Sequence, residues 1–327
     1  MRYSASEKLE IIGLVEHSAI GVKRTLAQLG IPKSTFYNWY GRYLEGGLRS
    51  LEDRKPMPGH VWNKISDRVK EDVVNFALEI PELSPRELAV RYTDEKNYYI
   101  SESSVYRILK SHDLITSPAF IVMKAKDKFD QPTTAPNQLW QTDFTYFKII
   151  GWGWYYLSTV LDDYSRYILS WRLCTTMSAA DVTETLQDAL DSSGLKSMRV
   201  NHKPRLLSDN GPCYVSSELA HWLGEQGMNH TRGKPYHPMT QGKIERYHRT
   251  MKNQILLENY YLPSELEAKL DAFVTYYNER RYHESLSNLT PKDVYFGRAE
   301  TVLKKRDKIK QETMLLRKKL HDEQKAV

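Results

Sequence analysis

The stretch that decides the fold begins at Leu139-Trp-Gln-Thr-Asp143-Phe-Thr-Tyr-Phe147 and continues to Leu173. It contains three segments rich in aromatic and β-branched residues: 139–150, 154–161 and 167–173. The short pieces between them, Gly151-Trp-Gly153 and Asp162 to Arg166, are composed of turn formers. The pattern therefore predicts three consecutive strands joined by hairpin turns.

The chain beyond this hairpin region alternates between helical and extended patterns. We predict helices at 180–191, 216–226, 243–259 and 264–280, and short strands at 205–207 and 229–232. Hairpin strands followed by alternating helix and strand are typical of an α/β domain in which helices flank a mixed sheet.

Two helical units precede this domain. In the first, a third helix opens after Pro32 and carries short polar residues at its start, with Phe36 and Trp39 turned inward. This is the helix-turn-helix plan, although a plain three-helix core has the same pattern. In the second, Ser84 and Glu87 form a capping box. That unit also resembles a helix-turn-helix, with a structural spacer as the alternative.

These patterns divide the chain into six parts. The predicted domains are 1–48, a helix-turn-helix domain; 49–65, a linker; 66–116, a second helix-turn-helix-like domain; 117–136, a linker; 137–297, the α/β domain; and 298–327, a basic helix. The apolar spacing of Val302, Ile309 and Leu316 in the last part indicates an amphipathic helix that packs on this or another protomer.

Composition limits the partners. The net charge of +6 and pI near 9.0 favour a polyanion without proving one, because many housekeeping proteins are equally basic. Cys174 and Cys213 are too few and too far apart for a Cys-x-x-Cys zinc site or a disulfide framework. The longest apolar stretch is broken by glycines, which argues against a membrane partner. We therefore predict a cytoplasmic protein.

Three carboxylates stand out by their surroundings. Asp143 lies in the middle of an aromatic strand, where a charge is costly to bury unless it is paired or bound to metal. Asp209 ends an apolar strand and precedes Asn210-Gly211, and Glu245 lies early in a basic helix. Taken singly, Asp209 is typical of a turn and Glu245 of a solvated helix face. Together, the three carboxylates offer only oxygen ligands, with no thiolate or imidazole beside them. Such a set suits two Mg²⁺ or Mn²⁺ ions that catalyse in-line phosphoryl transfer.

The motifs around these carboxylates resemble a known family. Trp140-Gln-Thr-Asp143-Phe-Thr-Tyr, Ser208-Asp-Asn-Gly211 and Gly242-Lys-Ile-Glu245-Arg-Tyr-His248 resemble the catalytic blocks of bacterial insertion-sequence transposases with a retroviral-integrase-like core. The run from Tyr276 to His283 and Leu289-Thr-Pro291 resemble the same family's C-terminal signature. The resemblance implies a ribonuclease-H-like fold, two-metal catalysis, recognition of terminal inverted repeats and strand transfer into other DNA.

The chain departs from viral integrases at its N-terminus. Those proteins begin with a His/Cys zinc module, and no cysteine precedes Cys174 here. The bacterial branch therefore fits better than the viral one.

Further residues are predicted to support DNA binding and the site. The expected DNA contacts are Lys33, Ser34, Thr35, Asn38 and Arg42 in the third helix, and Lys243, Arg246, Arg249 and Lys252 around Glu245. Such helix charges are otherwise simply solvated. His237, Gln241 and His248 are candidate supports of the catalytic residues, with a packed structural histidine as the alternative for His248. Asp162 and Asp163 are predicted to be turn residues rather than metal ligands.

The leading hypothesis is a transposase that acts on double-stranded DNA as a homo-oligomer, at least a dimer. The alternatives are a catalytically inactive DNA-binding regulator and a structure-specific ribonuclease-H-like nuclease that lacks the joining step.

Overall fold

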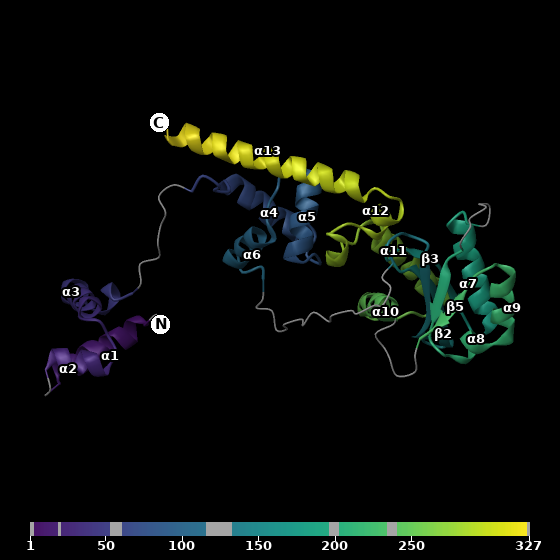
Figure 1. Ribbon diagram of the computed structural model, residues 1–327, viewed down its shortest axis with the longest axis horizontal. Helices are drawn as coiled ribbons and strands as arrows, with labels where there is room; N and C mark the ends of the chain where they lie inside the picture. The colour runs from purple at the N-terminus through teal and green to yellow at the C-terminus, as the bar shows by residue number, and fades with distance from the viewer. Residues whose placement is uncertain are drawn as a thin grey trace. The chain divides into compact units, whose positions relative to one another are not determined.

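The computed structural model describes residues 3–18, 21–52, 61–115, 133–195, 203–233 and 241–325. Figure 1 gives its helices and strands in chain order. The chain divides into two compact units, residues 1–62 and 63–327, and each is described by itself.

The first unit holds three helices: α1 (Ala5–Glu16), α2 (Val22–Gln28) and α3 (Lys33–Ser50). Their apolar faces meet around the buried side chains of Ile12, Leu26 and Phe36. The ammonium of Lys8 is also buried there and donates to the carbonyl of Leu51 at 3.0 Å. The helix-turn-helix region predicted for this end of the chain is confirmed.

The second unit begins with another helical trio: α4 (Asp67–Glu79), α5 (Pro85–Lys96) and α6 (Glu102–Ser111). The predicted capping box is present, because Ser84 Oγ accepts from the Glu87 amide and Glu87 Oε2 accepts from the Ser84 amide, each at 3.3 Å. Val73, Leu88 and Val105 bring the three helices together in a small core.

A five-stranded sheet forms the centre of the second unit. Its strands are β1 (Leu139–Ile149), β2 (Gly153–Asp162), β3 (Ile168–Cys174), β4 (Arg205–Ser208) and β5 (His230–Arg232). The spatial order is β3-β2-β1-β4-β5. The first three strands are antiparallel, whereas β4 and β5 run parallel to β1. The mixed sheet predicted from the sequence is confirmed.

Helices cover both faces of this sheet (Figure 1). On one face, α7 (Ala179–Ser192), α8 (Pro212–Val215) and α9 (Ser217–Glu225) pack on a core that includes Trp140 and Val160. On the other, α10 (Gly242–Ile255) and α11 (Pro263–Glu279) pack on Phe147, Ile149, Leu157 and Leu161. Odd-numbered residues of β1 thus face α10, because side chains alternate along a strand.

The C-terminal part of the chain packs against the helical trio of α4, α5 and α6. After the short turns η2 (Glu284–Leu286) and α12 (Pro291–Tyr295), α13 (Ala299–Lys325) runs past α5 (Figure 1). Arg306 forms a two-bond ion pair with Asp94, at 2.8 and 2.7 Å. Arg317 donates to Tyr98 Oη, Asn63 Oδ1 and the Tyr99 carbonyl. This helix therefore packs on its own chain, one of the two possibilities that the sequence left open.

No helix in the described ranges is long and apolar enough to cross a bilayer.

Candidate active site

The register of the sheet brings Asp143 and Asp209 to neighbouring positions. The last parallel pair between β1 and β4 is Gln141 with Leu207, and each aspartate lies two residues further along its strand direction. Adjacent strands are about 4.8 Å apart, so the two carboxylates lie side by side just beyond the last paired residues of β1 and β4. Each carboxylate accepts a hydrogen bond from a backbone amide at 2.9 Å. The Phe144 amide donates to Asp143 Oδ1, and the Gly211 amide donates to Asp209 Oδ1.

The two carboxylates interact electrostatically. The pKa of Asp209 is raised, chiefly by desolvation at the strand end and further by the charge of Asp143, against the lowering effect of the Gly211 amide. Two like charges side by side disfavour ionisation of at least one of them. The site therefore concentrates negative charge and oxygen donors at one point.

Helix α10 lies against the face of β1 that carries Gln141 and Asp143. His248 Nδ1 is 3.5 Å from Asp143 Oδ2. One turn later, the ammonium of Lys252 sits 4.4 Å from the ring centre of Tyr146 on β1. Desolvation lowers the pKa of Lys252, and the charge of Asp143 opposes that change. Glu245, three residues before His248, projects from the same side of α10.

Glu245 is not gathered with the two aspartates. Its side chain is exposed, and the described residues contain no group of three His, Cys, Asp or Glu side chains close enough to hold a metal ion. The structure thus brings Asp143 and Asp209 together and leaves Glu245 on the neighbouring helix. That all three act together stays a prediction.

The three residues predicted to support the catalytic carboxylates differ in their surroundings. His248 is buried, and within the described part of the chain its Nε2 has no hydrogen-bond partner. Gln241 is buried as well, and its Nε2 donates to the Thr142 carbonyl at 3.4 Å. His237 lies outside the described residues.

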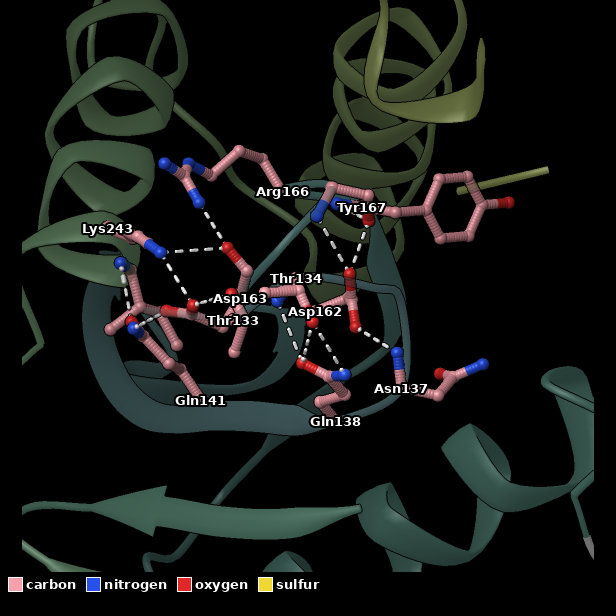
Figure 2. Close-up of polar contacts among 12 residues, drawn as sticks. Thr133, Thr134, Asn137, Gln138, Gln141, Asp162, Asp163, Arg166, Tyr167 and Lys243 are labelled. Carbon is pink, nitrogen blue, oxygen red and sulfur yellow. Dashed lines mark hydrogen bonds and ion pairs between the residues drawn. The ribbon is translucent and has the colours of Figure 1, made fainter. Parts of the chain in front are cut away.

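Asp162 and Asp163, predicted to be turn residues, have different surroundings (Figure 2). Asp162 accepts from the Ser165 amide and hydroxyl at 2.8 and 2.6 Å and from the Asn137 amide at 2.7 Å, which is a turn role. Burial raises the pKa of Asp162 above its usual range, and the bonds from Ser165 and Asn137 oppose this.

Asp163 is 2% exposed and has long-range partners that sequence reasoning missed. Its carboxylate accepts from Gln141 Nε2 at 2.7 Å, Thr133 Oγ1 at 2.6 Å and Lys243 Nζ at 2.6 Å. A signal in the sequence was the polar Gln141 in the first half of β1, next to the buried Trp140. Such a side chain needs a partner when buried.

Most of the predicted DNA contacts are accessible, but two are engaged within the protein. Lys33, Ser34 and Asn38 are exposed at the start of α3, Thr35 is half-buried, and Arg246 and Arg249 are exposed on α10. Arg42 donates to the carbonyls of Ser50 and Glu52. Lys243 is 11% exposed in its ion pair with Asp163. The roles of Arg42 and Lys243 as DNA contacts stay predictions.

Four segments of the chain match known domain families. Residues 133–238 and 226–291 match two models that are both described as an integrase core domain. The region from 133 to 291 is therefore similar to integrase core domains. Residues 7–59 match a helix-turn-helix domain and 35–109 a homeodomain-like domain. The helix-turn-helix character of the N-terminal region and the integrase-like core, both expected from the resemblance to insertion-sequence transposases, are thereby confirmed.

Similar curated proteins come from bacteria and viruses. The chain is 28% identical over 163 residues to the transposase for insertion sequence element IS904 of Lactococcus lactis, covering 49% of this chain and 62% of that protein. It is 27% identical over 188 residues to the transposase for IS629 of Shigella sonnei, covering 56% and 61%. A Gag-Pro-Pol polyprotein of sheep pulmonary adenomatosis virus is 30% identical over 159 residues, covering 49% and 8%. The chain thus spans about three-fifths of these two transposases.

Solved structures give a weaker likeness. The HTLV-2 integrase catalytic core domain in complex with magnesium has 22% identity and a TM-score of 0.40, covering 49% of this chain and 97% of that one. A simian T-cell lymphotropic virus intasome chain has 20% identity and a TM-score of 0.45, covering 68% and 74%.

Proposed function

We propose that this protein is a DNA transposase that binds the terminal inverted repeats of a mobile element, cuts DNA strands there and transfers them to a target. The observation that supports this most strongly is the adjacency of Asp143 and Asp209, beside α10, within an integrase core. We place this activity in the bacterial cytoplasm, on DNA.

The donor chemistry of the site fits a divalent cation. Asp143 and Asp209 offer carboxylate oxygens without thiolate, and their mutual repulsion is what a cation relieves. We propose that both aspartates and Glu245 hold two Mg²⁺ or Mn²⁺ ions, with the exposed Glu245 side chain turning inward to complete the set. When bound, such ions activate the attacking oxygen and neutralise charge on the leaving oxygen.

The remaining side chains have supporting roles in this proposal. His248 orients the Asp143 carboxylate from α10, and Gln241 holds the backbone at Thr142 next to it. Arg246, Arg249 and Lys252 contact phosphates, because all three lie on α10 within two turns after Glu245. At the other end of the chain, Ser34, Thr35 and Asn38 read base edges from the start of α3.

Single substitution of Asp143, Asp209 or Glu245 by Ala tests the catalytic set. We expect cleavage and joining to fall by at least about a thousandfold, since the metal supplies several kcal/mol and each ~1.4 kcal/mol is a factor of ten. Binding to labelled element ends should stay near normal. Glu267→Ala removes an exposed carboxylate on α11 and should change neither. Near-normal nicking by one of the three variants would remove that residue from the set.

The same assay separates the alternatives. An inactive regulator binds end DNA without nicking it in Mg²⁺ or Mn²⁺, and a structure-specific nuclease nicks without joining. Only a transposase produces strand-transfer products from the cut ends.

We also propose that at least two protomers act on two ends, because a single catalytic set offers one place for in-line chemistry. Light scattering with end DNA should give a paired complex. Mixing Glu245→Ala protein with wild type should reduce activity more steeply than dilution alone. One chain per DNA end, with activity falling only in proportion to dilution, would contradict the pairing.

A further inference from the structure

The first turn of α10 is held by side chains from outside the helix. Its N-cap, Gln241, makes no side-chain capping bond. The amide of Ile244 instead donates to Gln141 Oε1 of β1 at 3.2 Å. Because the first N–H groups of a helix have no partner within it, Gln141 caps α10 from the sheet.

Asp163 determines which way the Gln141 amide points. A carboxylate only accepts hydrogen bonds, so the NH₂ end of Gln141 must face Asp163 Oδ1, at 2.7 Å. The carbonyl end is thereby turned toward the amide of Ile244. Without Asp163, nothing would prevent the Gln141 amide from flipping, and its NH₂ group would then face the N–H of Ile244, which is also a donor.

Lys243 completes the arrangement from α10 itself. Its Nζ is 2.6 Å from Asp163 Oδ2 and 3.0 Å from the Asp163 carbonyl. The two side chains are 11% and 3% exposed, so the pair is shielded from water. Removing one partner of such a pair leaves an uncompensated buried charge, which is strongly destabilising.

From these contacts we propose that Gln141, Asp163 and Lys243 form a clamp that positions Glu245 for metal binding. The proposal rests on the proposed function. Gln141 and Asp143 lie two residues apart on the same face of β1, and Lys243 lies two residues before Glu245. One strand thus carries Asp143 and fixes the start of the helix that carries Glu245. Metal ligands must be held to within about half an ångström, which makes this link functional rather than only stabilising.

The test compares clamp variants with a matched ion pair elsewhere. Gln141→Glu keeps the acceptor but places a second carboxylate beside Asp163. Gln141→Met removes the cap without adding charge, so it serves if the first variant folds poorly. Asp94→Asn is the control, because Asp94 is also partly buried and paired with an arginine, Arg306, far from α10 in sequence.

Two readouts separate positioning from stability. The first is the Mn²⁺ concentration that gives half of the metal-induced rise in Tm without DNA. The second is end-DNA binding. We expect both Gln141 variants to need about tenfold more Mn²⁺, the size of effect typical of residues that orient metal ligands, with DNA binding unchanged. Asp94→Asn should lower Tm but leave the Mn²⁺ requirement as in wild type.

The outcomes are distinguishable. If the Gln141 variants lower Tm as the control does and keep the wild-type Mn²⁺ requirement, the clamp is only structural and the proposal is overturned. If wild type itself shows neither a metal-induced Tm rise nor cleavage, the proposed function fails and the clamp proposal fails with it.

Discussion

Replacing Arg317 with Met tests how firmly α13 holds the helical trio of α4, α5 and α6. Arg317 is 6% exposed and donates at 2.9 Å to Tyr98 Oη, 2.8 Å to Asn63 Oδ1 and 2.7 Å to the Tyr99 carbonyl. Its guanidinium also lies 5.0 Å from the ring centre of Tyr98. Methionine keeps most of the apolar stem and removes all of these contacts.

The magnitude follows from these contacts. A hydrogen bond to a charged group contributes about 1.5–3 kcal/mol, so three give roughly 5–9 kcal/mol before other terms. Burying the guanidinium costs several kcal/mol, which the variant recovers. Water can also re-enter at Tyr98 and Asn63, which are only half-buried. We therefore expect a net loss of about 2–4 kcal/mol in the local opening free energy of the trio.

Hydrogen exchange measures this locally. A loss of that size should raise amide exchange in α4, α5 and α6 by about 30- to 800-fold, since ~1.4 kcal/mol is a factor of ten. The neighbouring Lys318 is exposed, and Lys318→Met should leave exchange unchanged. A change of less than about threefold in the trio, or an equal change in α1 to α3, would refute the reasoning.

Two further predictions concern stability against pH and DNA recognition. Desolvation first, and then Arg281, Arg166 and Arg86, lower the pKa of His283 to about 3; its stabilising contribution is therefore complete above pH ~6.5 and lost as the pH falls toward 3, at about 1.4 kcal/mol per unit. The free energy of unfolding in urea should fall by about 2 kcal/mol more between pH 7 and pH 5 in wild type than in His283→Gln. An equal fall in both proteins would count against a neutral buried imidazole. Substituting Ala for Ser34, Thr35 or Asn38 should relax discrimination between end and random DNA. Substituting Ala for Arg246, Arg249 or Lys252 should instead weaken binding to both DNAs and flatten the salt dependence by about one unit per lost contact. The reverse pattern in filter binding would exchange the two roles.

Much of the fold could be predicted because its signals are local. Gly151 and Gly153 have φ of 82° and 94°, values that favour glycine and mark the turn between β1 and β2. The Ser84 capping box lies within one turn of α5. The buried face of α10 repeats at helical spacing through Ile244, Tyr247 and Met251. Each of these features is visible within a few residues.

The rest depends on partners that are distant in sequence. Asp163 has the local pattern of a turn residue, but its buried carboxylate forms an ion pair with Lys243, which lies 80 residues later in the sequence. Likewise, no sequence signal near Lys243 shows that its ammonium is paired with Asp163. The motifs predicted Asp143, Asp209 and Glu245 as one set, whereas the side chain of Glu245 is exposed, as its position in a basic helix would indicate when taken singly.

The packing of α13 on the helical trio has a consequence for synthesis. Asn63 and Arg317 are 254 residues apart, so the trio leaves the ribosome long before its partner helix exists. At about 5–20 residues per second, the interval is roughly 13–50 s. During that time the apolar and hydrogen-bonding surface around Tyr98 and Tyr99 is uncovered, and a nascent chain could use it to capture α13 from a neighbouring copy. Translation speed and chain crowding on one messenger therefore bear on whether each trio receives its own helix.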